Sequence, residues 1–198
     1  MSQRPLTRPS ARMMNHLELV YAPGERDLAR TLLEELGFRV IDPQKDPIPE
    51  NLGPAGGPFL IVYIDPENDD VIDNVLYASE AREDQKRFES ALRDRLAADK
   101  ELASLHANLC TAFKKTPQTM MHFGVAFPSP EEVKGALERI AGNAALKGRV
   151  TVSKTFEPGG PGSVDERVFQ GFVYTDVLSA GLLCVGLQIE LQVRLDGV

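Results

Sequence analysis

Two of the three histidines in the chain stand where they could take part in metal or acid–base chemistry. His16 begins the run 16–21, in which polar and apolar side chains alternate, and His122 begins the similar run 122–127. Imidazole binds transition metals and exchanges protons near neutral pH. The third histidine, His106, falls in a segment with helical spacing, so we interpret it as an ordinary hydrogen-bonded surface residue.

Two glutamates, Glu18 and Glu190, lie in runs of alternating polar and apolar residues near the two ends of the chain. In the run 187–193 every second side chain is apolar, which predicts a strand whose other face carries Glu190. Glu18 follows His16 by two residues and therefore lies on the same strand face. A glutamate in that place could act as a general base or hold the imidazole in position.

These residues are positioned by an order of elements that occurs twice. Each half predicts a strand, a helix and three further strands. The expected elements are a strand at 16–21, a helix at 28–36 and strands at 38–41, 59–64 and 74–79, then a strand at 121–127, a helix opened at 128–130 and strands at 150–155, 167–175 and 183–195. Ile61–Asp65 also matches Phe172–Asp176, and at the same spacing Glu190 falls opposite Ser79. The sequence therefore predicts an α+β fold made of two tandem βαβββ modules.

The segment between the modules has a different pattern. Residues 80–114 carry leucine and phenylalanine at helical spacing, and Pro117 ends the run. We expect two helices whose apolar stripe packs either against the outer wall of the modules or in a homodimer interface, because so long a stripe would otherwise face water. The predicted division is a tail at 1–13, a first module at 14–80, a helical insertion at 81–117 and a second module at 118–198.

The composition is that of an ordinary globular protein. The 198 residues are 42% hydrophobic and 26% charged, and the net charge of −7 argues against a nucleic-acid-binding groove. No stretch approaches the roughly 20 apolar residues of a membrane helix, and the basic start lacks the apolar core of a secretory signal. The two cysteines, Cys110 and Cys184, have no paired spacing, which fits a reducing compartment and excludes a cysteine-only zinc site. We therefore expect a cytoplasmic protein with no membrane or nucleic-acid partner.

The repeated order and its two histidines resemble the vicinal-oxygen-chelate superfamily, which includes glyoxalase I, extradiol dioxygenases, methylmalonyl-CoA epimerase and bleomycin-resistance proteins. The resemblance covers residues 14–80 and 119–195. It implies that the modules lie side by side and that their curved sheets form a cleft for a divalent metal. It also implies that His16, His122 and Glu190 are the metal ligands, since family members place ligands at these strand positions. Two imidazoles and one carboxylate suit Fe, Mn, Zn, Ni or Co and leave coordination positions open for a substrate.

One position departs from the family pattern. Many members carry a fourth ligand in the closing strand of the first module, where this chain has Ser79. Glu80 is one step away on the opposite strand face and would reach the cleft only through a β-bulge. Three ligands are typical of extradiol dioxygenases and hydroxyphenylpyruvate dioxygenase, whereas glyoxalases and the epimerase use four. The departure therefore favours the three-ligand chemistries.

The sequence thus predicts a metal-dependent protein acting on a small oxygen-chelating substrate, with a slight preference for dioxygenase chemistry of the extradiol type. The alternatives are a glyoxalase-like lyase or isomerase and a metal-free binding protein of the bleomycin-resistance type. Three tyrosines, Tyr63, Tyr77 and Tyr174, fall on or near the cleft face. We take Tyr77, Tyr174 and Glu18 as candidate catalytic residues, because a phenol there could position a substrate oxygen or donate a proton.

Overall fold

The computed structural model describes residues 14, 16–48, 58–67 and 74–195, so the predicted tail at 1–13 lies outside them. In these residues the chain forms four α-helices and two mixed β-sheets, which confirms the predicted α+β class. The helices are α1 (Arg26–Glu35), α2 (Glu83–Ala98), α3 (Lys100–Lys115) and α4 (Pro130–Gly142), with short 3-10 helices η2 (Pro117–Thr119) and η3 (Ala144–Leu146). The strands are β1 (His16–Tyr21), β2 (Arg39–Ile41), β3 (Leu60–Tyr63), β4 (Val75–Glu80), β5 (His122–Ala126), β6 (Val150–Val152), β7 (Val168–Thr175), β8 (Leu178–Ser179) and β9 (Leu187–Arg194).

The two sheets are connected in closely similar ways. The first has the strand order β2-β3-β4-β1-β8 and the second has the order β5-β9-β7-β6. In each half the first strand lies parallel to the last, β1 with β4 and β5 with β9, and the other pairs are antiparallel. The sequence did not predict β8, which comes from the second half and pairs with the end of β1. This pairing joins the two halves at the edge of the first sheet.

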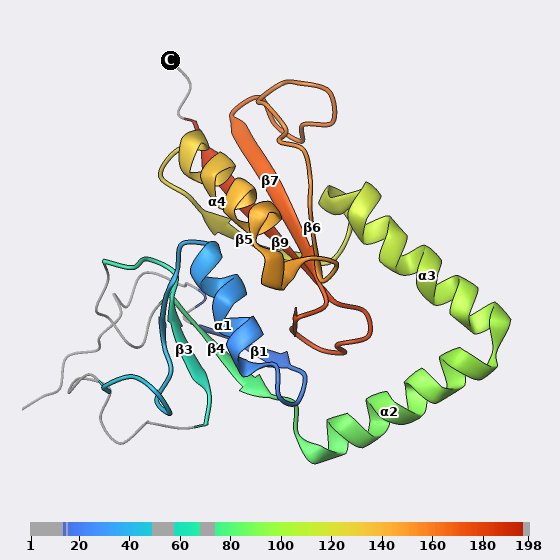
Figure 1. Ribbon diagram of the computed structural model, residues 1–198. Coiled ribbons are helices and arrows are strands. Elements are labelled where there is room, and N and C mark those ends of the chain that lie inside the picture. The colour runs from blue at the N-terminus through green and yellow to red at the C-terminus, as the bar shows by residue number, and fades with distance from the viewer. Residues whose placement is uncertain (1–13, 15, 49–57, 68–73, 196–198) are drawn as a thin grey trace, which may run out of the picture.

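One hydrophobic core spans both halves. Figure 1 shows α1 and α4 side by side against the sheets, and the two helices are in contact. Leu32 of α1 and Val133 of α4 belong to the same buried cluster as Leu19 of β1 and Ile189 of β9. Because side chains alternate along a strand, the other face of each sheet points away from this core. On the first sheet that face holds a second, smaller apolar cluster, made of Ile41, Ile61, Tyr63 and Val75.

Local sequence signals mark the start of α4 and the end of α1. At the start of α4, the Ser129 hydroxyl accepts a hydrogen bond from the Glu132 N–H at 3.2 Å, and Pro130 occupies the first helical turn. After α1, Gly37 adopts a φ of 92°, a left-handed conformation that favours glycine and stops the helix. Among the described residues, no helix combines the length and the apolar character needed to cross a bilayer.

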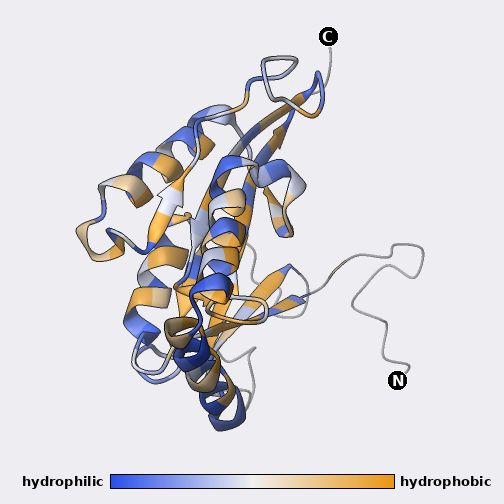
Figure 2. Ribbon diagram, turned by 90° about the vertical axis from the view of Figure 1, so that its right-hand side faces the viewer, coloured by the Kyte–Doolittle hydropathy of each residue, from blue (hydrophilic) through white to orange (hydrophobic). Residues whose placement is uncertain are grey.

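The helices α2 and α3 form an arm that projects from the body of the molecule (Figure 1). The two helices predicted in this segment are therefore confirmed. Figure 2 shows largely hydrophobic strands in the body and long hydrophilic stretches on the arm. Phe113 near the end of α3 is buried, but Phe88, Leu105 and Leu109 are 57%, 59% and 42% exposed. A single chain thus covers the apolar stripe only in part, and burial of the rest in a homodimer stays a prediction.

Candidate functional site

The second sheet carries a polar face on the side opposite α4. Along β5, β7 and β9, apolar side chains such as Val125, Val173 and Ile189 join the core, so the residues between them face away from it. The polar side chains on this outer face are His122, Gln170, Gln188, Glu190 and Gln192. Gln170, Gln188 and Glu190 are only 3%, 2% and 6% exposed, and buried polar groups of this kind need partners.

His122 and Glu190 are in direct contact on this face. The His122 Nε2 atom is 3.0 Å from Glu190 Oε2, and its Nδ1 atom is 2.6 Å from the Met120 carbonyl oxygen. Both neighbours are hydrogen-bond acceptors, so a neutral ring with one N–H can satisfy only one of them. The other contact needs a second proton or a cation between the two side chains. A neutral ring that donates from Nδ1 to a backbone carbonyl presents Nε2 as a metal ligand.

Two glutamine side chains fix the carboxylate of Glu190. Gln170 donates to Oε1, and Gln192 donates to the same oxygen at 2.9 Å. These bonds leave Oε2 for His122. Gly124 lies opposite Glu190 on the neighbouring β5, and a Cβ there would come within 3.4 Å of Oε2. Because Gly124 is exposed and has no side chain, Oε2 can be approached from this side.

Gln188 also lies on this face, and one atom of its side chain is buried without a hydrogen-bond partner in the described residues. Gln188 is the neighbour of His122 across β9 and β5, and its buried Oε1 accepts no hydrogen bond from the part of the chain that is described. An orphaned buried acceptor costs about 1–3 kcal/mol. A bound cation, water or ligand group would remove that cost.

The corresponding face of the first sheet holds His16, Glu18 and Tyr77. The rings of His16 and Tyr77 meet edge to face with their centroids 5.9 Å apart, and both His16 and Glu18 are exposed. Glu18 is the cross-strand neighbour of Tyr77. Burial raises the pKa of the Tyr77 hydroxyl, and the Glu18 carboxylate raises it further. The phenol is therefore protonated at neutral pH.

The strand register corrects the predicted equivalence of Ser79 and Glu190. In the antiparallel pairs, Ile61 lies opposite Tyr77, and its counterpart Phe172 lies opposite Glu190. The parallel pairs β1–β4 and β5–β9, aligned on their histidines, give the same answer. Tyr77 therefore occupies the place of Glu190 in the first sheet. The sequence match was wrong because the paired residues are 16 positions apart in the first hairpin, Ile61 and Tyr77, but 18 positions apart in the second, Phe172 and Glu190.

Glu80 does not reach the polar face. The strands β1 and β4 pair without a bulge as far as Tyr21 and Glu80, which keeps Glu80 one position out of step with Tyr77. Its carboxylate accepts hydrogen bonds from Lys86 Nζ at 2.9 Å and from the Gly24 N–H at 3.3 Å. These two bonds, that of Lys86 above all, hold the pKa of Glu80 below its usual value.

The structure brings together two of the three predicted metal ligands. His122 and Glu190 touch, whereas His16 lies on the other sheet, and the described ranges contain no group of three or more histidine, cysteine, aspartate or glutamate side chains placed to hold a metal. Tyr174 is engaged elsewhere, because its hydroxyl donates to the Val185 carbonyl at 2.9 Å. Burial, more than any other influence, raises the pKa of Tyr174 well above its usual value.

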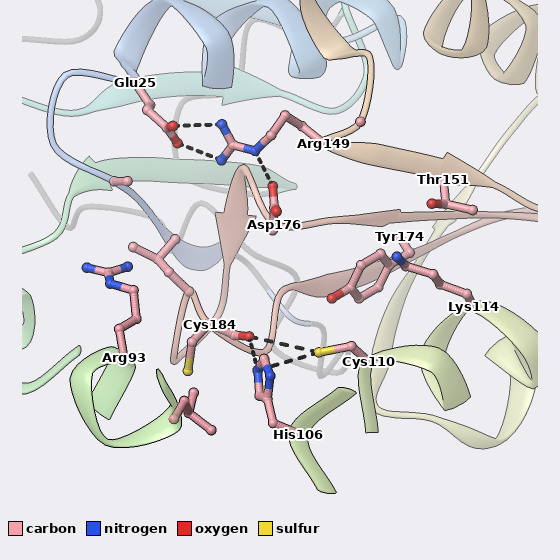
Figure 3. A pocket seen from close by; sticks show the side chains of 14 residues that line it. Glu25, Arg93, His106, Cys110, Lys114, Arg149, Thr151, Tyr174, Asp176 and Cys184 are labelled. Carbon is pink, nitrogen blue, oxygen red and sulfur yellow. Dashed lines mark hydrogen bonds and ion pairs between the residues drawn. The ribbon is translucent and has the colours of Figure 1, made fainter. Parts of the chain in front are cut away.

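A separate pocket of about 480 Å³ lies between α3 and the body of the molecule (Figure 3). Arg149 forms one wall. Its guanidinium donates to both carboxylate oxygens of Glu25, at 2.7 and 3.0 Å, and to Asp176 at 2.5 Å. Since Glu25 precedes α1 and Asp176 follows β7, these bonds connect the two halves.

The opposite wall holds three residues to which the sequence assigned no chemistry. His106 and Cys110 project from α3, and Cys184 lies in the loop before β9. The His106 Nε2 atom is 2.6 Å from the Cys184 carbonyl oxygen and 3.6 Å from Cys110 Sγ. The predicted hydrogen-bonded role of His106 is thus observed, but in a pocket rather than on an open surface. The spacing of His106 and Cys110 on one helix was the only available signal, because Cys184 is far away in sequence.

Comparisons with protein-family models, with curated proteins and with solved structures find no match to this chain. The superfamily resemblance described above therefore stays a prediction.

Proposed function

We propose that this protein consists of two βαβββ modules of the vicinal-oxygen-chelate type and binds a small oxygen-bearing molecule through a divalent transition metal. The strand orders support the modules, since they are the same in both halves apart from β8. The parallel pairing of first and last strands supports the site, because it sets each predicted histidine beside the closing strand of its half.

The contact between His122 and Glu190 carries the proposal. Imidazole nitrogen and carboxylate oxygen each bind transition metals at about 2.0–2.2 Å, so two such ligands at a right angle lie about 3.0 Å apart. The observed 3.0 Å between Nε2 and Oε2 fits this spacing. The Met120 carbonyl orients the ring and two glutamines orient the carboxylate, as outer partners of metal ligands do.

We assign the third ligand position to His16, which holds the matching place on the first sheet. A bound metal, one of Fe, Mn, Zn, Ni or Co, would act as a Lewis acid on paired substrate oxygens, and iron(II) would also bind dioxygen. Glu18 would orient the His16 ring or accept a proton. Tyr77, whose pKa is raised by burial and by Glu18, would keep its proton for donation to a substrate oxygen.

The fourth position supports oxygen-dependent chemistry of the extradiol type over isomerisation. A glyoxalase-like lyase or isomerase needs a second carboxylate beside the metal to move a proton. Here Tyr77 stands in that place, and Glu80 is held by Lys86 away from the polar face. The glyoxalase-like reaction remains the alternative within the enzymes.

Metal-free binding is the second candidate function. It is favoured by the separation of His16 from the other two ligands, which leaves only two of them together in the described ranges. In this case the buried glutamine-rich face would bind the small molecule through hydrogen bonds, with the unsatisfied Gln188 Oε1 as one acceptor.

The composition supports our proposals for the cellular location and the partners of the protein. The net charge of −7 supports a protein without a nucleic-acid partner, and the unpaired spacing of the cysteines supports a cytoplasmic location. The partner we propose is the small molecule, with a homodimer formed through the exposed part of the arm.

Loss of either contacting ligand is expected to weaken metal binding strongly. His122→Ala and Glu190→Gln should each lower the affinity for Fe²⁺ or Zn²⁺ by about 100-fold or more, since even outer partners account for 10–100-fold. The affinity is measured by chelator competition on protein purified without chelator, in a background in which Cys110 and Cys184 are serine. The circular dichroism spectrum should not change.

His106→Ala in the same background is the matched control and should bind metal like its parent. Negligible metal content together with no uptake of added metal would contradict the metal site and favour metal-free binding. Oxygen uptake by iron-loaded protein with a panel of catechols and 2-oxo acids would support the dioxygenase. Turnover of hemithioacetals without oxygen uptake would instead support the isomerase.

A further inference from the structure

The pocket beside α3 is lined by cysteine and histidine side chains, which are common ligands of transition metals. Both of the chain's cysteines and one of its three histidines line this pocket. His106 and Cys110 come from the arm and Cys184 comes from the body, so the pocket assembles them from distant parts of the sequence (Figure 3). We propose that His106, Cys110 and Cys184 form a binding site for a thiophilic metal ion such as Zn²⁺.

The spacing of His106 and Cys110 suits two ligands of one metal. Zn²⁺ binds imidazole nitrogen at about 2.0–2.1 Å and thiolate sulfur at about 2.3 Å, which in a tetrahedral site sets the two atoms about 3.5–3.6 Å apart. The observed separation of His106 Nε2 and Cys110 Sγ is 3.6 Å. The two residues lie four positions apart on α3, so one helix face presents both.

Cys184 faces this pair from the loop before β9. Its carbonyl oxygen is 2.6 Å from His106 Nε2 and 4.0 Å from Cys110 Sγ, so the backbone of Cys184 lies beside both donors. Figure 3 shows its sulfur turned away from the pair, so the three donors do not yet surround one point, in agreement with the absence of a preformed three-ligand group in the described ranges. Rotation about the Cα–Cβ bond of Cys184 would carry the thiolate toward the other two donors. The bound metal would replace the proton on His106 Nε2 and, with it, the hydrogen bond to the Cys184 carbonyl.

The backbone at Cys184 is fixed by a buried carboxylate on the arm. Glu89 of α2 is 1% exposed and accepts hydrogen bonds from the N–H groups of Leu183 and Cys184, at 3.0 and 3.1 Å. Gln85 also donates to it, at 2.8 Å. These bonds hold the loop beside the arm, so the site requires rotation of the Cys184 side chain and a small shift of the Cys184 carbonyl, which lies 2.6 Å from His106 Nε2.

The donor types and surrounding charges select the metal. Two thiolates and one imidazole favour Zn²⁺ or Cu⁺ over Mg²⁺ and Ca²⁺, and three protein ligands leave one position open to the pocket. Arg93 and Lys114 also line the pocket, and their positive charges offset those of the thiolates. The nearby carboxylates Glu25 and Asp176 are already bound to Arg149, so they do not compete as ligands.

Such a site would fasten the arm to the body. α2 buries only one residue, Glu89, and α3 buries only Phe113, so few apolar contacts hold the arm in place. A metal shared by α3 and the loop before β9 would add a link between them, independent of His122 and Glu190.

The test is a titration of the reduced, full-length protein with Co²⁺, which replaces Zn²⁺ and gives an intense near-ultraviolet charge-transfer band only when thiolates bind it. We expect the band to correspond to one thiolate-bound Co²⁺ per chain and to be lost on addition of Zn²⁺. Cys110→Ser and Cys184→Ser should remove or strongly reduce the band, and His106→Ala should weaken Co²⁺ binding by about 100-fold or more. His106 and Cys110 lie on the partly exposed face of the arm, so their variants test the site even where Cys184→Ser disturbs the loop.

His122→Ala is the control and should keep the full band, which separates this site from the one proposed above. A reduced protein that gives no thiolate band, or a band that survives Cys110→Ser, would overturn the proposal. Formation of a Cys110–Cys184 disulfide in air without any metal binding by the reduced form would also overturn it. Failure here leaves the test on His122 and Glu190 unaffected.

Discussion

Replacing Arg26 by methionine is expected to lower the free energy of unfolding by about 3–5 kcal/mol, the usual range when one partner of a buried ion pair is removed. The partner is Asp42, whose side chain is fully buried. Arg26 donates to both of its oxygens, from Nε at 3.0 Å and from Nη2 at 2.6 Å. Methionine keeps most of the aliphatic length but leaves the carboxylate without its counter-charge.

A second bond adds to this loss. Arg26 Nη1 also donates to the hydroxyl of Tyr21 at 2.9 Å, and Tyr21 is 1% exposed. The matched control is Arg30→Met one turn further along α1. Arg30 pairs with the more exposed Glu34 and Asp46, so its loss is expected to change stability by about 1 kcal/mol or less. Urea unfolding of both variants at pH 7 measures the difference.

The pH dependence of the Arg26 effect has a definite sign. The hydrogen bonds from Arg26 hold the pKa of Asp42 below its usual value. A lowered folded-state pKa stabilises the protein above the unfolded value of about 4, and this contribution is lost as the pH falls through the folded value. The gap between wild type and Arg26→Met should therefore be largest near neutral pH and shrink on acidification below about pH 4. A gap that stays constant down to acid unfolding would contradict this account.

The period of the strands made much of this fold predictable. Alternation in 16–21 and 187–193 correctly placed Leu19 and Ile189 in the core and left Glu190 on the other face. Helical spacing likewise predicted the two helices of the arm. These patterns are local, so they can be recognised within one window of sequence.

The strand register and the contacts between distant segments could not be predicted from local sequence patterns. The match of Ser79 with Glu190 was made by counting residues along the chain. The strand pairs β3–β4 and β7–β9 instead place Tyr77 at the position equivalent to Glu190. The strand β8 pairs with β1 from the far end of the chain, and two residues are too few to give a periodic signal. Cys184 reaches His106 for the same reason, because tertiary contacts bring the loop before β9 to the arm.

Part of the candidate site could be predicted from local patterns, and part depends on contacts between distant segments. Strand alternation was enough to predict that His122 and Glu190 face the same side, and their contact follows from β5 lying beside β9. The glutamine pair that orients Glu190 was not predicted, since the partner from β7 is chosen by sheet order. The position of His16 relative to that pair depends on how two sheets pack, which no strand pattern specifies.

Gly186→Ala is expected to lower the free energy of unfolding by about 2–5 kcal/mol. Gly186 has a φ of 76°, where an L residue pays roughly 1–2 kcal/mol. A Cβ there would also lie 2.5 Å from the Thr175 carbonyl oxygen and 2.9 Å from the Tyr174 hydroxyl oxygen. Overpacking of this kind adds about 1–3 kcal/mol, because the backbone of β7 would have to move.

Gly148→Ala separates the two causes. Gly148 has a similar φ of 81°, but a Cβ there would meet nothing within 4 Å, so only the conformational part of about 1–2 kcal/mol should appear. Thermal and urea unfolding of both variants give the comparison. Equal losses would show that the close approach of Gly186 to β7 contributes nothing. A larger loss of unfolding free energy for Gly186→Ala would show that this glycine lets the start of β9 pack closely against Tyr174 of β7, whose ring borders the pocket.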